Sequence, residues 1–275
     1  METFKLWNGT AIPAVGYGSY LATEGGKDVI KAALDAGYRY IDTARFYRNE
    51  DEIGEALEEY GIDRKDIFLV SKVWPGDLGR DLTLKSFEAS LESLKTDYLD
   101  MYLIHWPKAR QNDPEQEKLC IETWKLMEEL YKDGRIRNIG LSNFLPHHLR
   151  PILEIAEVKP MLDQLELHVG YMQEYTLAFL RENGILAQSW SPLGRGRVLN
   201  DERVSKIAAD HSVTNAKVLL RYLYQRGIPS IPKASSMERM KENMDIFGFT
   251  LTEDEISILS TIPQEGWSGE HPDLV

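Results

Sequence analysis

The stretch of sequence that decides the fold is residues 67–107, IFLVSKVWPGDLGRDLTLKSFEASLESLKTDYLDMYLIHWP. It contains two short apolar runs, at 67–70 and 99–104, which predict strands buried on both faces. Between these runs, apolar residues recur at helical spacing at Leu84, Phe87, Leu91 and Leu94. A strand, a helix and a second strand in this order predict parallel strands joined by a right-handed crossover.

The same alternation continues on both sides of this segment. The other strand candidates are 15–18, 40–41, 136–141, 161–165, 185–187 and 228–231. Helical spacing of apolar residues recurs at 53–60, 120–131 and 149–156, and glycines that can end helices follow at Gly37, Gly134 and Gly184. Eight strands alternating with helices predict an α/β fold, a closed (β/α)8 TIM barrel that forms one domain over residues 1–275.

Local signals predict how some of these elements begin. Asn8-Gly9 lies between short apolar runs and suits a type I′ turn, which predicts an N-terminal β-hairpin outside the repeat. Asn49 followed by Glu52 predicts a capping box at a helix start. Polar stretches at 107–117, 191–203 and 262–275 are long for a barrel, and we expect them to be functional loops.

Composition excludes several classes of function. A formal net charge of -12 argues against a nucleic-acid or anionic-membrane binder, because either needs a basic surface. The single cysteine, Cys120, excludes an internal disulfide and a multi-cysteine zinc site. We expect a cytoplasmic protein, since we find neither a secretory signal nor a long apolar segment. The run from Gly16 to Leu21 lacks the last glycine of the Rossmann fingerprint.

Polar or stacking side chains follow the strand candidates at their carboxyl ends. Asp42, Lys72 and His105 come after three of the apolar runs, and the corresponding positions further along the chain are Ser142, Asn143, Gln164, Trp190 and Lys233. Each residue alone has an ordinary explanation, such as a helix cap, a buried amide or a solvated lysine. Because the carboxyl ends of barrel strands meet at one rim, the whole set predicts an active site there.

Tyr47 completes a set of residues suited to reducing a carbonyl group. The phenol can donate the proton that the developing alkoxide needs, but a free phenol has a pKa of about 10. An ammonium at Lys72 would lower the pKa of Tyr47, and Asp42 would keep that ammonium charged and oriented. His105 would hydrogen-bond the carbonyl oxygen. With one histidine and one aspartate among these residues, we expect no metal site.

These residues stand within longer motifs. The motifs are Tyr40–Ala44 with Tyr47 and Asn49-Glu50, Ser71–Trp74, Asp97–Pro107, Ile139–Phe144, Ser191–Gly194, and Ile231–Lys233 leading to Arg239 and Glu242-Asn243. By these motifs the chain resembles the aldo-keto reductase family over essentially its whole length, and in particular bacterial diketogluconate and glyoxal reductase-like members. The resemblance implies a barrel with an N-terminal hairpin and extra C-terminal helices.

The resemblance also implies an activity and its residues. The activity is NADPH-dependent reduction of small aldehydes, dicarbonyls and keto-sugars to alcohols, with Asp42, Tyr47, Lys72 and His105 as a catalytic tetrad and Tyr47 as the general acid. Ser142, Asn143 and Gln164 would bind the nicotinamide carboxamide, and Trp190 would stack on its ring. Ser191, Leu193 and Gly194 would surround the pyrophosphate. Lys233, Ser235 and Arg239 would bind the adenosine phosphate, with Glu242 and Asn243 near the adenine.

The phosphate end of this cofactor site also has independent support. A basic pair with small hydroxyls before a helix suits a phosphate, which favours NADPH. This sequence has Ala234 where serine is usual in the family, and Ser236 where some bacterial members have arginine. Both changes thin the phosphate pocket, so use of NADH stays open.

Aromatic residues would form the substrate pocket. By the resemblance, its walls are Tyr20, Phe46, Trp74 and Trp106, together with His105, and Trp267 is a further candidate. We expect a monomer whose partners are small carbonyl compounds, not nucleic acid or membrane. The alternative is a barrel that binds the dinucleotide but hardly turns over, like the potassium-channel β-subunits of the family. The complete tetrad argues against that alternative.

Overall fold

The computed structural model describes residues 2–22, 25–107 and 115–275 of the chain. Seven strands form a parallel sheet in sequential order. They are β3 (Tyr17–Gly18), β4 (Tyr40–Asp42), β5 (Phe68–Val73), β6 (Met101–Ile104), β7 (Ile139–Ser142), β8 (Leu162–Glu166) and β9 (Leu186–Trp190). Every residue of β4, β6, β7 and β8 is buried, as predicted for strands covered on both faces. The predicted loop 107–117 lies mostly outside the described residues.

The sheet closes into a barrel through Ser230. The predicted eighth strand, 228–231, is wrong as a regular strand: it forms isolated bridges, in which Ser230 pairs with Val15 on one side and Ser189 on the other. Ser230 N donates to the Ala14 carbonyl oxygen at 3.0 Å, and Ile231 N donates to that of Ser189 at 3.1 Å. Prolines at 229 and 232 remove the N–H donors that a longer ladder would need. The predicted (β/α)8 barrel is confirmed, with a shortened last strand.

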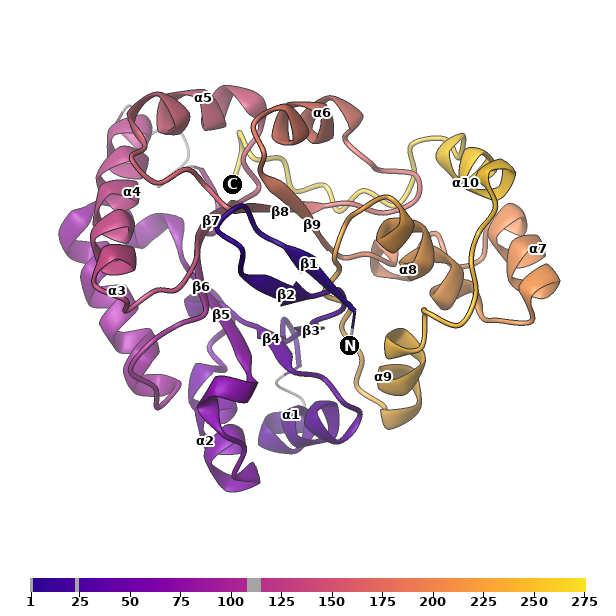
Figure 1. Ribbon diagram of the computed structural model, residues 1–275, viewed down its shortest axis with the longest axis horizontal. Coiled ribbons are helices and arrows are strands. Elements are labelled where there is room, and N and C mark those ends of the chain that lie inside the picture. Colours follow the sequence, from indigo (N-terminus) through magenta and orange to yellow (C-terminus); the bar gives the residue numbers. More distant parts are fainter. Residues whose placement is uncertain (1, 23–24, 108–114) are drawn as a thin grey trace.

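The N-terminal hairpin consists of β1 (Thr3–Lys5) and β2 (Ala11–Pro13). Gly9 has a φ of +89°, but Asn8 has no positive φ, so the predicted type I′ turn is wrong. Gly9 N donates to the Leu6 carbonyl oxygen and Leu6 N donates to that of Thr10, which gives a longer loop that needs one left-handed residue. Asn8 donates its side-chain amide to Asn138, just before β7, at 2.9 Å. The hairpin therefore covers the amino-terminal end of the barrel, and Figure 1 shows it across the centre.

Helices surround the barrel, as Figure 1 shows. They are α1 (Gly26–Asp35), α2 (Glu50–Tyr60), α3 (Arg80–Ser93), α4 (Gln116–Lys132), α5 (Pro146–Ile155), α6 (Glu174–Glu182), α7 (Glu202–His211), α8 (Asn215–Gln225), α9 (Met237–Met244) and α10 (Glu253–Ser260). Short 3-10 turns are η2 (Arg45–Tyr47), η3 (Arg64–Asp66), η4 (Pro75–Asp77) and η5 (Gly194–Gly196). The predicted extra C-terminal helices are confirmed. No helix in the described part of the chain is long and apolar enough to cross a bilayer.

The helix ends follow the predicted glycines. Gly37, Gly134 and Gly184 have φ values of +104°, +76° and +70°, as expected where a helix ends in a left-handed residue. The predicted capping box of α2 is wrong. Asn49 precedes the helix, but its side chain makes no cap hydrogen bond. It accepts from the Thr43 hydroxyl at 2.7 Å and donates to the Ser19 carbonyl oxygen at 2.9 Å, so it ties neighbouring rim loops together.

Candidate active site

The predicted catalytic residues lie together at the carboxyl end of the barrel. Asp42 is the last residue of β4, Lys72 lies near the end of β5, and His105 follows β6. Tyr47 comes from η2, the short turn after β4. Adjacent parallel strands in register place these side chains on one rim.

Lys72 connects the other members of this group. Its side chain is fully buried. Nζ donates to Asp42 Oδ1 at 2.5 Å, to the Thr43 carbonyl oxygen at 2.9 Å and to the phenolic oxygen of Tyr47 at 3.3 Å. Burial lowers the pKa of Lys72 and raises that of Asp42, and their mutual attraction opposes both shifts. The three acceptors fix the ammonium beside the phenol.

The pKa of Tyr47 shifts in the direction opposite to the prediction. We expected Lys72 to lower the pKa of Tyr47, but burial raises that pKa well above its ordinary value, and the charge of Asp42 adds to the effect. The expectation is wrong because it omitted the cost of removing the phenolate from water, and because Asp42 offsets the charge of Lys72. The phenol therefore keeps its proton at neutral pH, which suits a proton donor.

His105 is held neutral on the other side of this group. Its side chain is buried, and Nδ1 has no hydrogen-bond partner among the described residues. Burial lowers the pKa of His105 well below its usual value, and the nearby charge of Lys72 lowers it further. The Asn143 side-chain amide donates to the backbone carbonyl of His105 at 3.0 Å and fixes this loop. A neutral imidazole here can hydrogen-bond a carbonyl oxygen.

The residues predicted to bind the carboxamide and the ring of the nicotinamide form one network. Trp190 Nε1 donates to Asn143 Oδ1 at 2.8 Å, and Asn143 Nδ2 donates to Ser142 Oγ at 3.1 Å. Ser142 Oγ donates to the backbone carbonyl of Gln164 at 2.9 Å, while Gln164 Nε2 donates to Asp42 Oδ2 at 2.8 Å. The network thus joins the predicted cofactor residues to the tetrad. Its amides and its indole ring suit a planar carboxamide and an aromatic ring.

Gln188 belongs to this network but was not among the predicted residues. Its Oε1 accepts from Gln164 Nε2 and from the Tyr40 hydroxyl, both at 2.9 Å, while its Nε2 has no partner among the described residues. Gln188 therefore orients Gln164 from the next strand. The sequence signal for Gln188 was its position at the strand that follows the one with Gln164. The structure pairs these two residues in register.

The loop after β9 has a backbone suited to wrap around an anion. Ser191, Gly194, Arg195 and Gly196 all have positive φ values, which turns the chain tightly. Leu193 lies half-buried between them. Arg195, which was not among the predicted residues, pairs with Glu270 at 2.8 Å, and its guanidinium lies 5.8 Å from the Trp190 ring centre.

The predicted phosphate residues gather at the start of α9. Arg239 donates from Nε to Ser236 Oγ at 3.2 Å and from a terminal nitrogen to Ser235 Oγ at 3.1 Å. Ser236 also caps α9 by accepting from the Arg239 backbone N–H. Lys233 and Arg239 are exposed. Of the two residues predicted near the adenine, Asn243 is buried and Glu242 is partly exposed.

The predicted substrate residues form aromatic walls beside the tetrad. Phe46 stacks on Trp74 with ring centres 3.8 Å apart, and the Trp74 ring lies 5.2 Å from that of His105. Tyr20 lies 4.9 Å from Tyr47. On the side of the predicted cofactor residues, the Trp106 ring lies 6.4 Å from that of Trp190. The Phe46 and Tyr20 side chains are exposed beside the tetrad.

Trp267 lies in the C-terminal tail, stacked on Tyr171 with ring centres 6.2 Å apart. The tail is fixed where Ser268 donates from N and Oγ to Glu166, at 2.9 and 2.7 Å. The charge of Glu270 contributes to the raised pKa of Tyr47, after the larger effects of burial, Asp42 and Tyr20. The tail therefore lies close to the rim that holds the tetrad.

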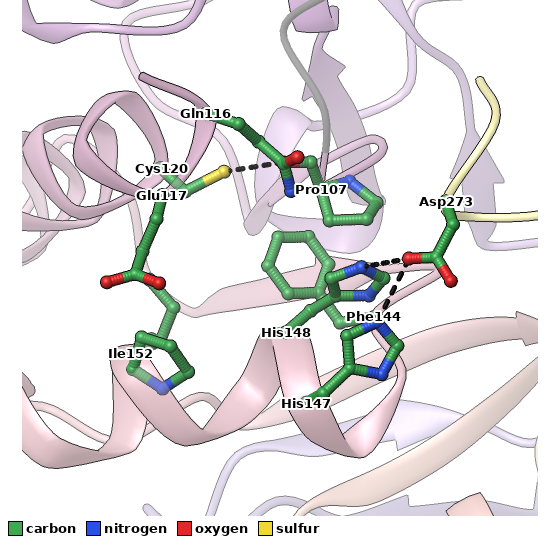
Figure 2. Close-up of a pocket in the computed structure, with 10 residues that line it drawn as sticks. Pro107, Gln116, Glu117, Cys120, Phe144, His147, His148, Ile152 and Asp273 are labelled. Atoms are coloured by element: carbon green, nitrogen blue, oxygen red, sulfur yellow. Dashed lines mark hydrogen bonds and ion pairs between the residues drawn. The ribbon is translucent and has the colours of Figure 1, made fainter. Parts of the chain in front are cut away.

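The same tail brings Asp273 to two histidines, His147 and His148, at the start of α5 (Figure 2). The Nε2 atoms of His147 and His148 lie 2.9 and 2.8 Å from Asp273 Oδ1. Three such groups can hold a metal ion, but the Leu145 N–H donates to His148 Nδ1 at 3.2 Å. A metal on Nε2 would put the ring hydrogen on Nδ1, against that donor. The contacts instead suit His148 donating to the carboxylate and clasping the tail, so the expectation of no metal site stays a prediction.

A cavity of about 300 Å³ adjoins this clasp. Figure 2 shows its walls, which include Pro107, Cys120 and Phe144, with Cys120 Sγ donating to the Pro107 carbonyl oxygen at 2.8 Å. Burial raises the pKa of the Cys120 thiol to about 12, which makes it unreactive. None of the four predicted catalytic residues lines this cavity.

Comparisons with known proteins agree with this fold. The family model described as "Aldo/keto reductase family" matches residues 5–263. The chain is 41% identical to a glyoxal reductase of Bacillus subtilis (strain 168), over 99% of this chain and 96% of the relative. A crystal structure of an aldo/keto reductase from Brucella melitensis superposes with a TM-score of 0.89 at 39% identity, covering 95% of this chain and 99% of that one.

A second solved structure contains a cofactor. It is a mutant of Gox0644 in complex with NADPH, with a TM-score of 0.91 at 38% identity, covering 99% of this chain and 97% of that chain. The family match and these relatives cover nearly all of the chain. The chain therefore belongs to the aldo/keto reductase family, whose enzymes are NAD(P)H-dependent oxidoreductases.

Proposed function

We propose that this protein reduces small aldehydes and dicarbonyls, and also keto-sugars, to alcohols with NADPH. The observation that carries the proposal is the position of Lys72 Nζ, which is hydrogen-bonded both to Asp42 at 2.5 Å and to the phenolic oxygen of Tyr47 at 3.3 Å. That arrangement places a fixed positive charge beside a protonated phenol. The glyoxal reductase of Bacillus subtilis supports the dicarbonyl part.

The residues divide the reduction between them. NADPH, when bound, supplies a hydride to the carbonyl carbon. Tyr47 donates its proton to the carbonyl oxygen as negative charge develops there, so the products are an alcohol and the oxidised cofactor. Lys72 stabilises the phenolate that remains, and Asp42 holds Lys72 in place. Neutral His105 directs the carbonyl oxygen toward the phenol.

The cofactor assignment rests on the chemistry of the donors. Amide and hydroxyl groups at Ser142, Asn143 and Gln164 suit the carboxamide, and the Trp190 ring suits stacking on the nicotinamide. The linked hydroxyls and guanidinium of Ser235 and Arg239, with Lys233 nearby in the sequence, suit a phosphate at the start of α9. We assign NADPH as the preferred cofactor for this reason, with NADH as the weaker one.

The test is a turnover screen with NADPH and NADH against small aldehydes, dicarbonyls, keto-sugars and steroids. We expect Tyr47→Phe to lower the rate by at least about 100-fold, because it removes the proton donor. The cofactor should still quench tryptophan fluorescence in that variant. Tyr60→Phe makes the same chemical change on the exposed end of α2 and should keep the wild-type rate. EDTA should leave the rate unchanged.

Two results would contradict the proposal. Retained turnover in Tyr47→Phe would remove the phenol from the mechanism. Binding of NADPH without turnover of any carbonyl by the wild-type protein would favour the regulatory barrel instead.

A further inference from the structure

Glu50 is a buried carboxylate behind the tetrad that the proposed mechanism does not use. It begins α2 and is only 2% exposed. Oε1 accepts from Ser71 Oγ at 2.6 Å, and Oε2 accepts from Ser90 Oγ at 3.1 Å. Arg45 donates to Oε2 at 3.3 Å. An ionised carboxylate is costly to bury, so these contacts must stabilise its charge.

The partners of Glu50 come from the elements that hold the reacting groups. Ser71 precedes Lys72 on β5, and Arg45 begins η2, which carries Tyr47. Successive residues of a strand point to opposite sides, so Ser71 faces Glu50 while Lys72 faces the barrel interior. Ser90, on α3, anchors the carboxylate from outside the barrel. The Glu50 side chain thus links β5, which carries Lys72, to η2, which carries Tyr47.

We propose that Glu50 is a positioning residue for the reduction. It fixes η2 against β5 and supplies a second negative charge behind the Lys72–Tyr47 pair. This inference rests on the proposed function. It assigns to Glu50 no contact with substrate or cofactor.

The charges around Lys72 indicate the direction of the effect. The groups that face it are Asp42, Tyr47 and neutral His105. Burial lowers the pKa of Lys72, while Asp42 and, more weakly, Glu50 raise it. Removal of a negative charge makes both an ammonium and a phenol lose a proton more easily. Loss of the Glu50 charge therefore favours deprotonation of the pair at a lower pH.

The charges around Glu50 do not cancel this effect. Besides Ser71 and Ser90, it faces Arg45, and it acts electrostatically on buried Tyr102 of β6, which stays protonated because burial raises its pKa. The Arg45 side chain is 41% exposed and that of Glu50 is 2% exposed. Water screens the charge of exposed Arg45 more than that of buried Glu50. The two side chains together therefore act on Lys72 as a negative charge.

The experiment is the pH dependence of kcat/KM for carbonyl reduction. Glu50→Gln keeps the size and the acceptor oxygen but removes the charge. We expect its alkaline limb to shift to lower pH by about half to one unit, which corresponds to a lost electrostatic stabilisation of about 0.7–1.4 kcal/mol. Glu50→Asp keeps the charge and should keep the alkaline limb near its wild-type position.

Ser90→Ala is the matched control. It removes one hydrogen bond to the same carboxylate without changing any charge, so it should lower thermal stability but leave the alkaline limb in place. If Glu50→Gln and Ser90→Ala both lose stability and neither shifts the limb, Glu50 is only a structural residue and the inference is overturned. The proposed function would survive that result, because it fails only if the wild-type protein shows no turnover or Tyr47→Phe remains active.

Discussion

At the scale of single residues, His105 makes the stability of the protein depend on pH. The fold holds this imidazole neutral because burial lowers its pKa, whereas the unfolded chain takes up a proton below about pH 6.5. The stabilisation is therefore present above that pH and lost as the pH falls below it. Urea unfolding at pH 7.5 and pH 5 should show that wild type loses about 2 kcal/mol more than His105→Gln. Equal losses would mean that His105 takes up a proton in the fold as readily as in the unfolded chain.

Arg239 is the residue that we expect to separate the two cofactors. Its guanidinium is bonded to Ser235 and Ser236, and is exposed where a phosphate can approach. Charge-assisted hydrogen bonds are strong, so Arg239→Ala should raise the KM for NADPH by about 10- to 100-fold and hardly change that for NADH. Steady-state kinetics with both cofactors test this, with Arg181→Ala, on the exposed face of α6, as the control. Equal effects on both cofactors would place the phosphate elsewhere.

That these residues would lie together could be predicted from the sequence, but their protonation could not. Asp42, Lys72 and His105 each follow an apolar run, and strand ends of a barrel converge whatever the loops do. The direction of the Tyr47 pKa shift depends instead on how much water the folded loops exclude. Gln188 directly follows the predicted strand 185–187 and was passed over for Trp190, whereas Arg195 lies within a loop, where nothing in the sequence marks its role.

At the scale of elements, the packing of α2 on α3 depends on Gly54. A Cβ added there would lie 2.3 Å from the Ser93 carbonyl oxygen and 2.9 Å from the carbonyl carbon of Leu94. Helix propensity alone favours alanine by about 1 kcal/mol, but backbone atoms cannot move aside as a side chain can. We expect Gly54→Ala to lower the free energy of unfolding by about 1–3 kcal/mol in urea.

Glu55→Ala is the control for this substitution, since it adds an alanine at an exposed position of the same helix. It should change stability by about 0.5 kcal/mol or less. If Gly54→Ala were as stable as that control, the two helices would pack with more space between them than the structure has. The sequence could predict that α2 exists from its apolar spacing, but not this close approach. The start of α2 was predicted correctly, but its capping box was not, because the Asn49 side chain forms hydrogen bonds with other loops.

At the scale of the whole molecule, the alternation of strands and helices made the barrel predictable, while its closure was harder to predict. Seven strands pair along short ladders, but the ring is completed by the backbone of Ser230 between Val15 and Ser189. The apolar letters at 228–231 suggested a full strand. The two prolines that shorten it are visible in the sequence, but their effect depends on which N–H groups the neighbouring strands need.

This closure makes Ser230→Pro a test of whether the barrel unfolds as one unit. Proline removes the N–H that Ser230 donates to the Ala14 carbonyl oxygen at 3.0 Å. Because Ser230 and Ala14 are both buried, no water can replace this hydrogen bond. We expect a loss of about 3 kcal/mol or more in urea unfolding, with a single transition, because each strand of a closed ring supports the next. Ser230→Ala keeps the backbone donor and should stay close to wild type. If the proline variant matched the alanine variant, the ring would not depend on this residue; a second, earlier transition would mean that the two edges separate before the rest unfolds.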